Sequence, residues 1–171
     1  MKTTISVKKL TISALFMALN IVLSSFSIPV PGGHLYLCDI AICTAAILLD
    51  PFHAAVVGGV GSFLGDFFFY PAPMFVSLVT HGVQALVISM FVNRIFKKNN
   101  KAGAIAGVSI GAVIMVIGYT LGRAYVYSTP EYAIIKLPFE ILQAGIGAVA
   151  GVIICFHCGI RNIYKKIIGD T

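Results

Sequence analysis

Charged side chains are scarce in this sequence, and tryptophan is absent. Only 11% of its 171 residues are charged, whereas 58% are hydrophobic, and the mean hydropathy is +0.97. Soluble domains carry about 25% charged residues, so this composition excludes an ordinary soluble domain. The net charge of +6 does not indicate nucleic-acid binding, which needs a basic face with interleaved stacking groups. We therefore expect an integral membrane protein.

Catalytic and nucleotide-binding motifs are also missing. The sequence has no Gly-x-x-x-x-Gly-Lys loop and no His-Glu-x-x-His helix. We therefore expect no enzyme, no cofactor and no use of ATP by this chain itself. Cys155 and Cys158 have the spacing of metal ligands, but Cys38 falls at the opposite end of the expected bundle. A site built from all four cysteines is geometrically excluded, and we expect no metal.

Long apolar runs dominate the rest of the chain. A helix needs about 20 apolar residues to cross about 30 Å of hydrocarbon, so residues 1–171 predict one transmembrane domain, an all-α compact bundle of six helices. The predicted spans are Leu10–Ile28, Cys38–Leu49, Phe52–Phe69, Phe75–Phe96, Gly103–Tyr127 and Ile134–His157. The second run is short, which suits either a short span or a re-entrant segment. Asp50-Pro51 separates it from the third.

Basic residues test this count independently, because lysine and arginine in short loops collect on the cytoplasmic side. Six spans place both termini and three basic groups inside, where they also favour contact with anionic lipids. The groups are Lys2, Lys8 and Lys9; Arg94, Lys97, Lys98 and Lys101; and Arg161, Lys165 and Lys166. Arg123 and Lys136 are the exceptions, since they fall near the outer side.

Small residues recur at four-residue spacing, which puts them on one helix face and lets helices approach closely. Most such pairs predict packing inside the bundle: Ala54 and Gly58, Gly61 and Gly65, Gly103, Gly107 and Gly111, Gly118 and Gly122, and Gly147 and Gly151. Ala14 and Ala18 differ, because their helix has few other small or polar features. We expect them to contact a separate protein.

Five ionisable residues fall in the outer half of the predicted bundle: Asp39, Asp66, His81, Arg123 and Glu140. Buried charges cost several kcal/mol unless they are paired or hydrated, and one shared cavity facing outward would accommodate all five. Helical spacing adds Gln84, Tyr119 and Gln143 to the same faces. The alternative is a set of internal ion pairs, Asp66–Arg123 or Glu140–Arg123, with His81 as a hydrogen-bonded core residue.

Residues 32–86 resemble the central block of the substrate-binding S components of energy-coupling factor (ECF) vitamin transporters, especially the riboflavin-transporter-like family. Leu37-Cys38-Asp39, Gly65-Asp66 and His81-Gly82 stand where that family has Leu-Gly-Asp, Ala-Asp and Lys-Gly. Ala14-x-x-x-Ala18 resembles the family's alanine motif, which contacts the coupling subunit. Cys38 replaces a glycine and His81 a lysine. The second change removes a permanent cation from the expected site, which counts against riboflavin.

The resemblance implies the substrate-capture subunit of an ECF-type ABC importer in the bacterial cytoplasmic membrane. Its partners would be a membrane coupling subunit and two ATPases, which use the ATP. The segment Pro29–Tyr36 would be a lid, with His34 and Tyr36 covering a planar ligand. The expected substrate-binding residues are His34, Tyr36, Asp39, Asp66, His81, Gln84, Tyr119, Arg123, Glu140 and Gln143. A pyridoxine-like or hydroxymethylpyrimidine-like ligand is favoured, with riboflavin and pantothenate as the other candidates.

Two other functions fit a polar cavity in a membrane bundle. A lipid-modifying enzyme would use Asp39, Asp66 and His81 as acid and base. An ion-coupled secondary transporter would carry a proton on Asp66 and Glu140. Such transporters usually contain inverted repeats and broken helices, and this sequence shows no convincing internal repeat.

Overall fold

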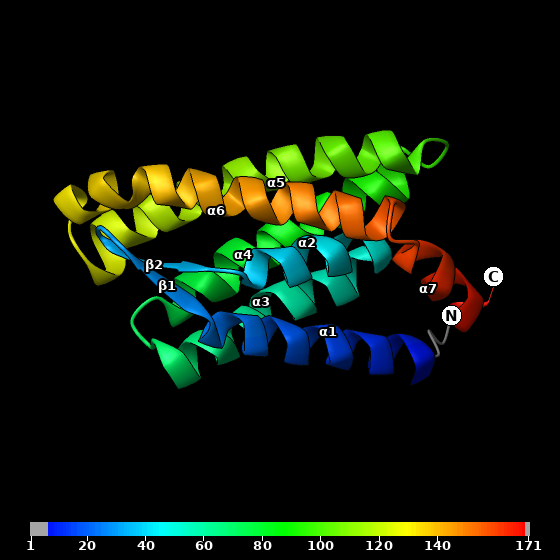
Figure 1. Ribbon diagram of the computed structural model, residues 1–171, viewed down its shortest axis with the longest axis horizontal. Coiled ribbons are helices and arrows are strands. Elements are labelled where there is room, and N and C mark those ends of the chain that lie inside the picture. Colours follow the sequence, from blue (N-terminus) through cyan, green and yellow to red (C-terminus); the bar gives the residue numbers. More distant parts are fainter. Residues whose placement is uncertain (1–6, 170–171) are drawn as a thin grey trace.

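The computed structural model describes residues 7–169, so Lys2 lies outside the described residues. The chain forms an elongated bundle of roughly aligned helices with one small hairpin at one end (Figure 1). Its elements are α1 (Val7–Ser25), β1 (Ser27–Val30), β2 (Gly33–Tyr36), α2 (Cys38–Leu48), α3 (Pro51–Phe69), α4 (Met74–Met90), α5 (Asn100–Gly122), α6 (Pro130–Phe156) and α7 (Ile160–Ile168). Two π-helical segments, η1 (Phe91–Ile95) and η2 (Arg123–Tyr127), continue α4 and α5.

The predicted membrane bundle is confirmed, with one short helix among the six. Helices α1, α3, α4 with η1, α5 with η2, and α6 are each long and apolar enough to cross a membrane. Helix α2 has 11 residues, which at 1.5 Å per residue gives about 16 Å, roughly half of the hydrocarbon thickness. The β1–β2 hairpin occupies the remaining depth, because β2 leads directly into the start of α2 (Figure 1).

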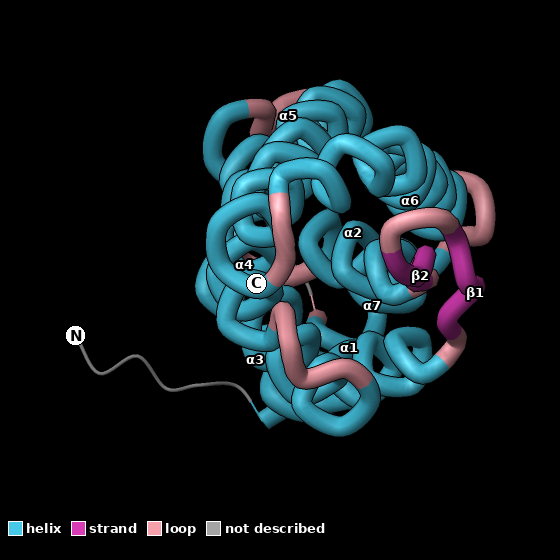
Figure 2. The backbone as a smooth tube through the Cα atoms, turned by 90° about the vertical axis from the view of Figure 1, so that its left-hand side faces the viewer, coloured by secondary structure: helices cyan, strands magenta, loops and turns pink. Residues whose placement is uncertain are grey.

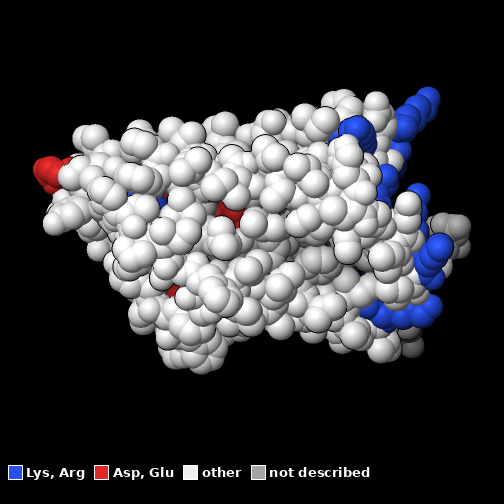
Figure 3. Space-filling model, in the orientation of Figure 1, with Lys and Arg blue, Asp and Glu red and all other residues white. Residues whose placement is uncertain are grey.

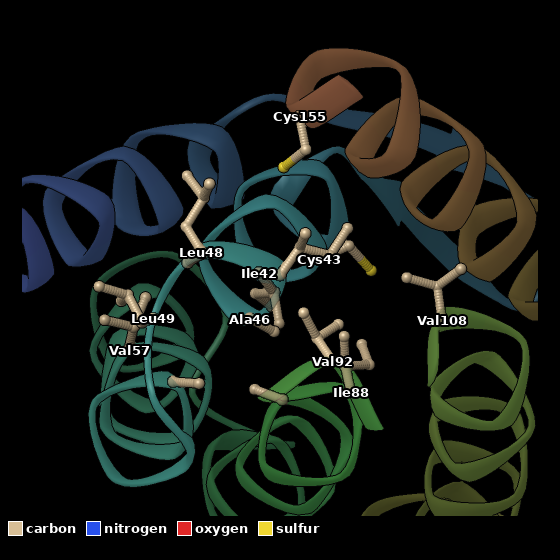
Figure 4. Packing of buried hydrophobic residues seen from close by; sticks show 14 of the residues in the cluster. Ile42, Cys43, Ala46, Leu48, Leu49, Val57, Ile88, Val92, Val108 and Cys155 are labelled. Carbon is tan, nitrogen blue, oxygen red and sulfur yellow. The ribbon is translucent and has the colours of Figure 1, made fainter. Parts of the chain in front are cut away.

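Helix α2 is the centre of the bundle. It is apolar on all sides, as expected for a helix surrounded by protein, and all but one of its side chains are buried. Helices α1, α3, α4 and α6 pack around it (Figure 2). Ile42 and Ala46 of α2 meet Val57 of α3 and Ile88 of α4 in the main hydrophobic core (Figure 4). The second predicted span is therefore a buried half-length helix.

Glycines bring the neighbouring helices close to α2 and to one another, as their spacing predicted. A Cβ atom added to Gly147 of α6 would lie 2.4 Å from Cβ of Asp39, and one added to Gly58 of α3 would lie 2.5 Å from the carbonyl oxygen of His81. Contacts that short do not occur between real Cβ atoms and their neighbours. Only glycine fits at either position without moving a helix.

The connection between the first two helices differs from the prediction. The first span was expected to run to Ile28, but α1 ends at Ser25, and Ser27–Val30 pairs antiparallel with Gly33–Tyr36. Proline at position 29 holds Ile28 in an extended conformation and excludes a helix there. Gly32 and Gly33 have φ angles of +81° and +149°, which a tight turn needs and other residues rarely adopt.

The two ends of the bundle differ in charge. Exposed lysine and arginine side chains gather at the end where α1 begins and α7 lies, called the basic end below (Figure 3). The hairpin defines the opposite, lid end. Helix α7 follows the last predicted span and was not predicted. The assignment of the basic end, with both termini, to the cytoplasm stays a prediction.

The close packing of α6 on α2 leads to a matched pair of substitutions. Gly147→Ala forces α6 away from Asp39 and should destabilise the protein by about 1–3 kcal/mol, the usual cost of overpacking. Gly145→Ala is the control, because a Cβ there meets nothing within 4 Å on the same helix. It should leave stability unchanged or raise it, since alanine favours helix. Equal melting temperatures for the two variants in detergent would contradict this packing.

Candidate functional site

A single polar cavity lies beneath the hairpin at the lid end. Residues from α1, the hairpin, α2, α3, the α3–α4 connection, α4, α5, η2 and α6 line it. Of the ten predicted substrate-binding residues, eight line this cavity: His34, Tyr36, Asp66, His81, Tyr119, Arg123, Glu140 and Gln143. Asp39 and Gln84 lie behind its wall, fully buried. The structure thus brings all ten into one region, although they come from seven different elements.

Asp39, which lies behind the cavity wall, accepts hydrogen bonds from two amide side chains. Its Oδ1 accepts a hydrogen bond from Nε2 of Gln84 at 3.1 Å, and its Oδ2 accepts one from Nε2 of Gln143 at 2.7 Å. Asp39 lies in the first turn of α2, where the helix dipole favours a negative charge. The buried carboxylate therefore links α2 to α4 and α6.

A second chain of hydrogen bonds ends on Asp66. The Ser77 hydroxyl donates to the Asp66 carboxylate, so it accepts from the hydroxyl of Tyr119. The chain links α3, α4 and α5 across the cavity. The Tyr119 ring also packs against His81, with the ring centroids 5.2 Å apart.

Glu140 holds the two basic residues that the charge pattern left unexplained. Its Oε1 lies 3.3 Å from Nη2 of Arg123 and 3.6 Å from Nζ of Lys136. Lys136 is 1% exposed and Arg123 8%, so the cluster is buried beside the cavity. The alternative prediction of a Glu140–Arg123 ion pair is confirmed. Asp66, by contrast, pairs with Ser77 rather than with Arg123.

The hairpin is fastened over the cavity at both of its ends. Nη1 of Arg123 donates to the carbonyl oxygen of Gly32 in the turn at 2.9 Å. The backbone N–H of Tyr36 donates to Oε1 of Gln143 at 2.9 Å. His34 packs edge-on against Tyr70 of the neighbouring connection. The enclosed cavity measures about 20 Å³, little more than one water molecule needs, so a heteroaromatic ring needs the lid or the walls to move.

Two polar atoms at the cavity lack partners among the described residues. They are Nε of Arg123 and the hydroxyl of Tyr127, both buried. Unpaired buried donors are costly, and both belong to η2. These two atoms are therefore available to a bound molecule.

Several residues of the site were not in the predicted set. Lys136 carried a sequence signal, since it precedes Glu140 by one helical turn and violates the charge asymmetry of the loops. Ser77 precedes His81 by the same spacing. Tyr70 gave no signal, because its contact with the lid depends on how two connections meet.

Cys38, Asp39 and His81 could be taken for a metal site, because one potential ligand atom of each lies within 4.8 Å of the others. Their hydrogen bonds argue otherwise. Both oxygens of Asp39 accept from glutamine amides, and Nδ1 of His81 lies 2.6 Å from Oε1 of Gln84. Asp39 and His81 thus use these atoms in hydrogen bonds within the protein rather than as metal ligands.

A helical membrane bundle that encloses one polar cavity under a hairpin is the arrangement of a membrane protein that binds a small polar molecule. Comparison with known proteins specifies the class. The chain belongs to the family described as ECF-type riboflavin transporter, S component, whose profile matches residues 4–159. It is thus a multi-pass membrane protein and an S component of a vitamin-transport system, and it is not an enzyme.

One relative has a more specific description. The chain is 30% identical to the thiamine precursor transporter HmpT of Lactococcus lactis subsp. cremoris (strain MG1363), over 69% of this chain and 85% of the relative. The family and this relative agree on transport, which removes the lipid-modifying enzyme from the candidates.

Proposed function

We propose that this S component captures a neutral or weakly basic heteroaromatic vitamin precursor, of the hydroxymethylpyrimidine type, in the cavity beneath the hairpin. The observation that carries the proposal is the internal pairing of the site's cations. Arg123 and Lys136 both pair with Glu140, and Arg123 also holds the lid. A carboxylate ligand would have to compete with Glu140 for these two cations, which disfavours pantothenate.

The remaining polar groups suit a small ring with mixed hydrogen-bonding groups. Asp66 offers an acceptor, and Arg123 Nε and the Tyr127 hydroxyl offer donors. Such pockets usually combine an apolar lining with a few placed polar groups. Since even one ring requires the lid or the walls to move, the three-ring system of riboflavin would require a larger movement. A pyridoxine-like ring remains the second candidate, and the description of the HmpT relative favours a thiamine precursor.

We further propose that the lid end faces outward and that the protein delivers its ligand through a membrane coupling subunit and two ATPases. The basic end then lies in the cytoplasm, as the positive-inside rule requires. Ala14 and Ala18 are both exposed on α1. Their outward-facing positions suit close contact with a helix of another protein.

The ligand proposal predicts the order of affinities in a small panel. The purified protein in detergent or lipid nanodiscs is titrated with a hydroxymethyl aminopyrimidine, pyridoxine, riboflavin and pantothenate by calorimetry. The aminopyrimidine should bind at least about tenfold more tightly than the others, the effect of one well-placed hydrogen bond. Tightest binding of pantothenate or riboflavin would overturn the proposed ligand class.

The coupling proposal predicts that transport and binding respond separately. Ala14→Leu with Ala18→Leu adds bulk to the exposed face of α1, far from the cavity, so ligand affinity should stay within about twofold while uptake into cells falls to background. Ser109→Leu, on the exposed face of α5, is the control and should leave both unchanged. Normal uptake by the double variant, or loss of its binding, would mean that α1 does not contact the coupling subunit there.

A further inference from the structure

We propose that the orientation of Gln84 places the ring proton of His81 on Nδ1, so that its Nε2 accepts a hydrogen bond from an amino group of the ligand. This inference rests on the proposed function for the identity of that ligand. The His81 side chain comes from α4 and lines the cavity, although it is only 1% exposed. Which ring nitrogen carries the proton decides whether it recognises a donor or an acceptor.

The orientation of Gln143 follows from the lid. The backbone N–H of Tyr36 can only donate, so the amide atom that faces it at 2.9 Å must be the oxygen of Gln143. The amide nitrogen of Gln143 therefore faces Oδ2 of Asp39, at 2.7 Å. This fixes one oxygen of Asp39 as an acceptor independently of any ambiguity in the amide.

The orientation of Gln84 follows from Asp39. An ionised carboxylate can only accept, so the atom of Gln84 that lies 3.1 Å from Oδ1 must be the amide nitrogen. The amide oxygen of Gln84 then faces Nδ1 of His81 at 2.6 Å. Since an amide oxygen cannot donate, the proton between them belongs to Nδ1. In the neutral ring, this leaves a lone pair on Nε2.

The hydrogen bond of Nδ1 goes to an uncharged amide and not to a carboxylate. The nearer oxygen of Asp39 lies 3.8 Å from Nδ1, beyond hydrogen-bond distance. Asp66 also lines the cavity, and its carboxylate accepts from Ser77 but keeps further lone pairs. Within residues 7–169, no hydrogen bond reaches Nε2 of His81.

This arrangement assigns a polarity to the ligand. Asp66 and Nε2 of His81 can both accept a hydrogen bond from the ligand. Nε of Arg123 and the Tyr127 hydroxyl can donate one to it. An aminopyrimidine with a hydroxymethyl group has an amino donor and a hydroxyl oxygen. Its oxo analogue, in which a carbonyl oxygen replaces the amino group, has almost the same shape and presents a lone pair to His81 instead.

The tautomer is measured first, without any ligand. ¹⁵N NMR of histidine-labelled protein in nanodiscs at neutral pH distinguishes protonated from bare ring nitrogens, and the chain has only four histidines. The signal lost in His81→Gln identifies His81. We expect a protonated Nδ1 and a bare Nε2, and we expect Gln84→Leu to abolish this preference while His53→Gln, at the basic end, keeps it. A protonated Nε2, in either the neutral ring or the imidazolium, overturns the inference.

The ligand preference is measured second. The wild-type protein should bind the aminopyrimidine at least about tenfold more tightly than its oxo analogue, and His81→Leu should reduce that ratio to near one. Thermal unfolding checks that the variant is folded, and Gln84→Leu gives a second, independent reduction. Equal affinity of the wild type for both compounds overturns the inference but not the proposed function. Failure of both compounds to bind overturns the proposed ligand class. It also overturns the inference that Nε2 of His81 accepts a hydrogen bond from an amino group of the ligand.

Discussion

The rest of the structure depends on one buried carboxylate, that of Asp39 at the start of the central helix α2. A charge in a membrane bundle is stable only if its neighbours supply hydrogen bonds or opposite charge. Here Gln84 of α4 and Gln143 of α6 supply them, and the dipole of α2 adds to their effect. Gly147 makes the arrangement possible, because it lets α6 approach the backbone of α2 at Asp39. The need to stabilise the buried charge of Asp39 therefore holds α2, α4 and α6 together at this residue.

Asp39 is also linked to both parts of the candidate site, the lid and the cavity wall. Through Gln143 it reaches the N–H of Tyr36 and so holds the base of the lid, and through Gln84 it reaches His81 in the cavity wall. The turn of the lid is held separately by Arg123, which Glu140 positions together with Lys136. The lid and the wall are thus both connected to Asp39, which is buried. A molecule that displaces either contact affects both.

The sequence predicted the bundle and most of the residues around the candidate site, for a simple reason. Apolar run length identifies spans, and an ionisable residue inside a span has few stable places other than a shared cavity. The hairpin was missed because its pairing is a contact between Ser27–Val30 and Gly33–Tyr36, whereas the apolar run continues from α1 to Ile28. Helix α7 was missed because it is amphipathic and too short to span. That Asp39 and Gln84 support the wall instead of lining it depends on how deeply α2 is buried, which spacing along one helix does not reveal.

The central claim is that Asp39 joins the lid to the binding site, and amide hydrogen exchange of the lid tests it most directly. The substitution Asp39→Ala removes the acceptor that orients both glutamines. The account predicts that exchange of the Tyr36 amide, and of the hairpin as a whole, becomes at least about tenfold faster. Amides in the middle of α5, which does not contact Asp39, should exchange as slowly as in the wild type. Unchanged exchange in the hairpin of a folded Asp39→Ala variant would contradict the claim.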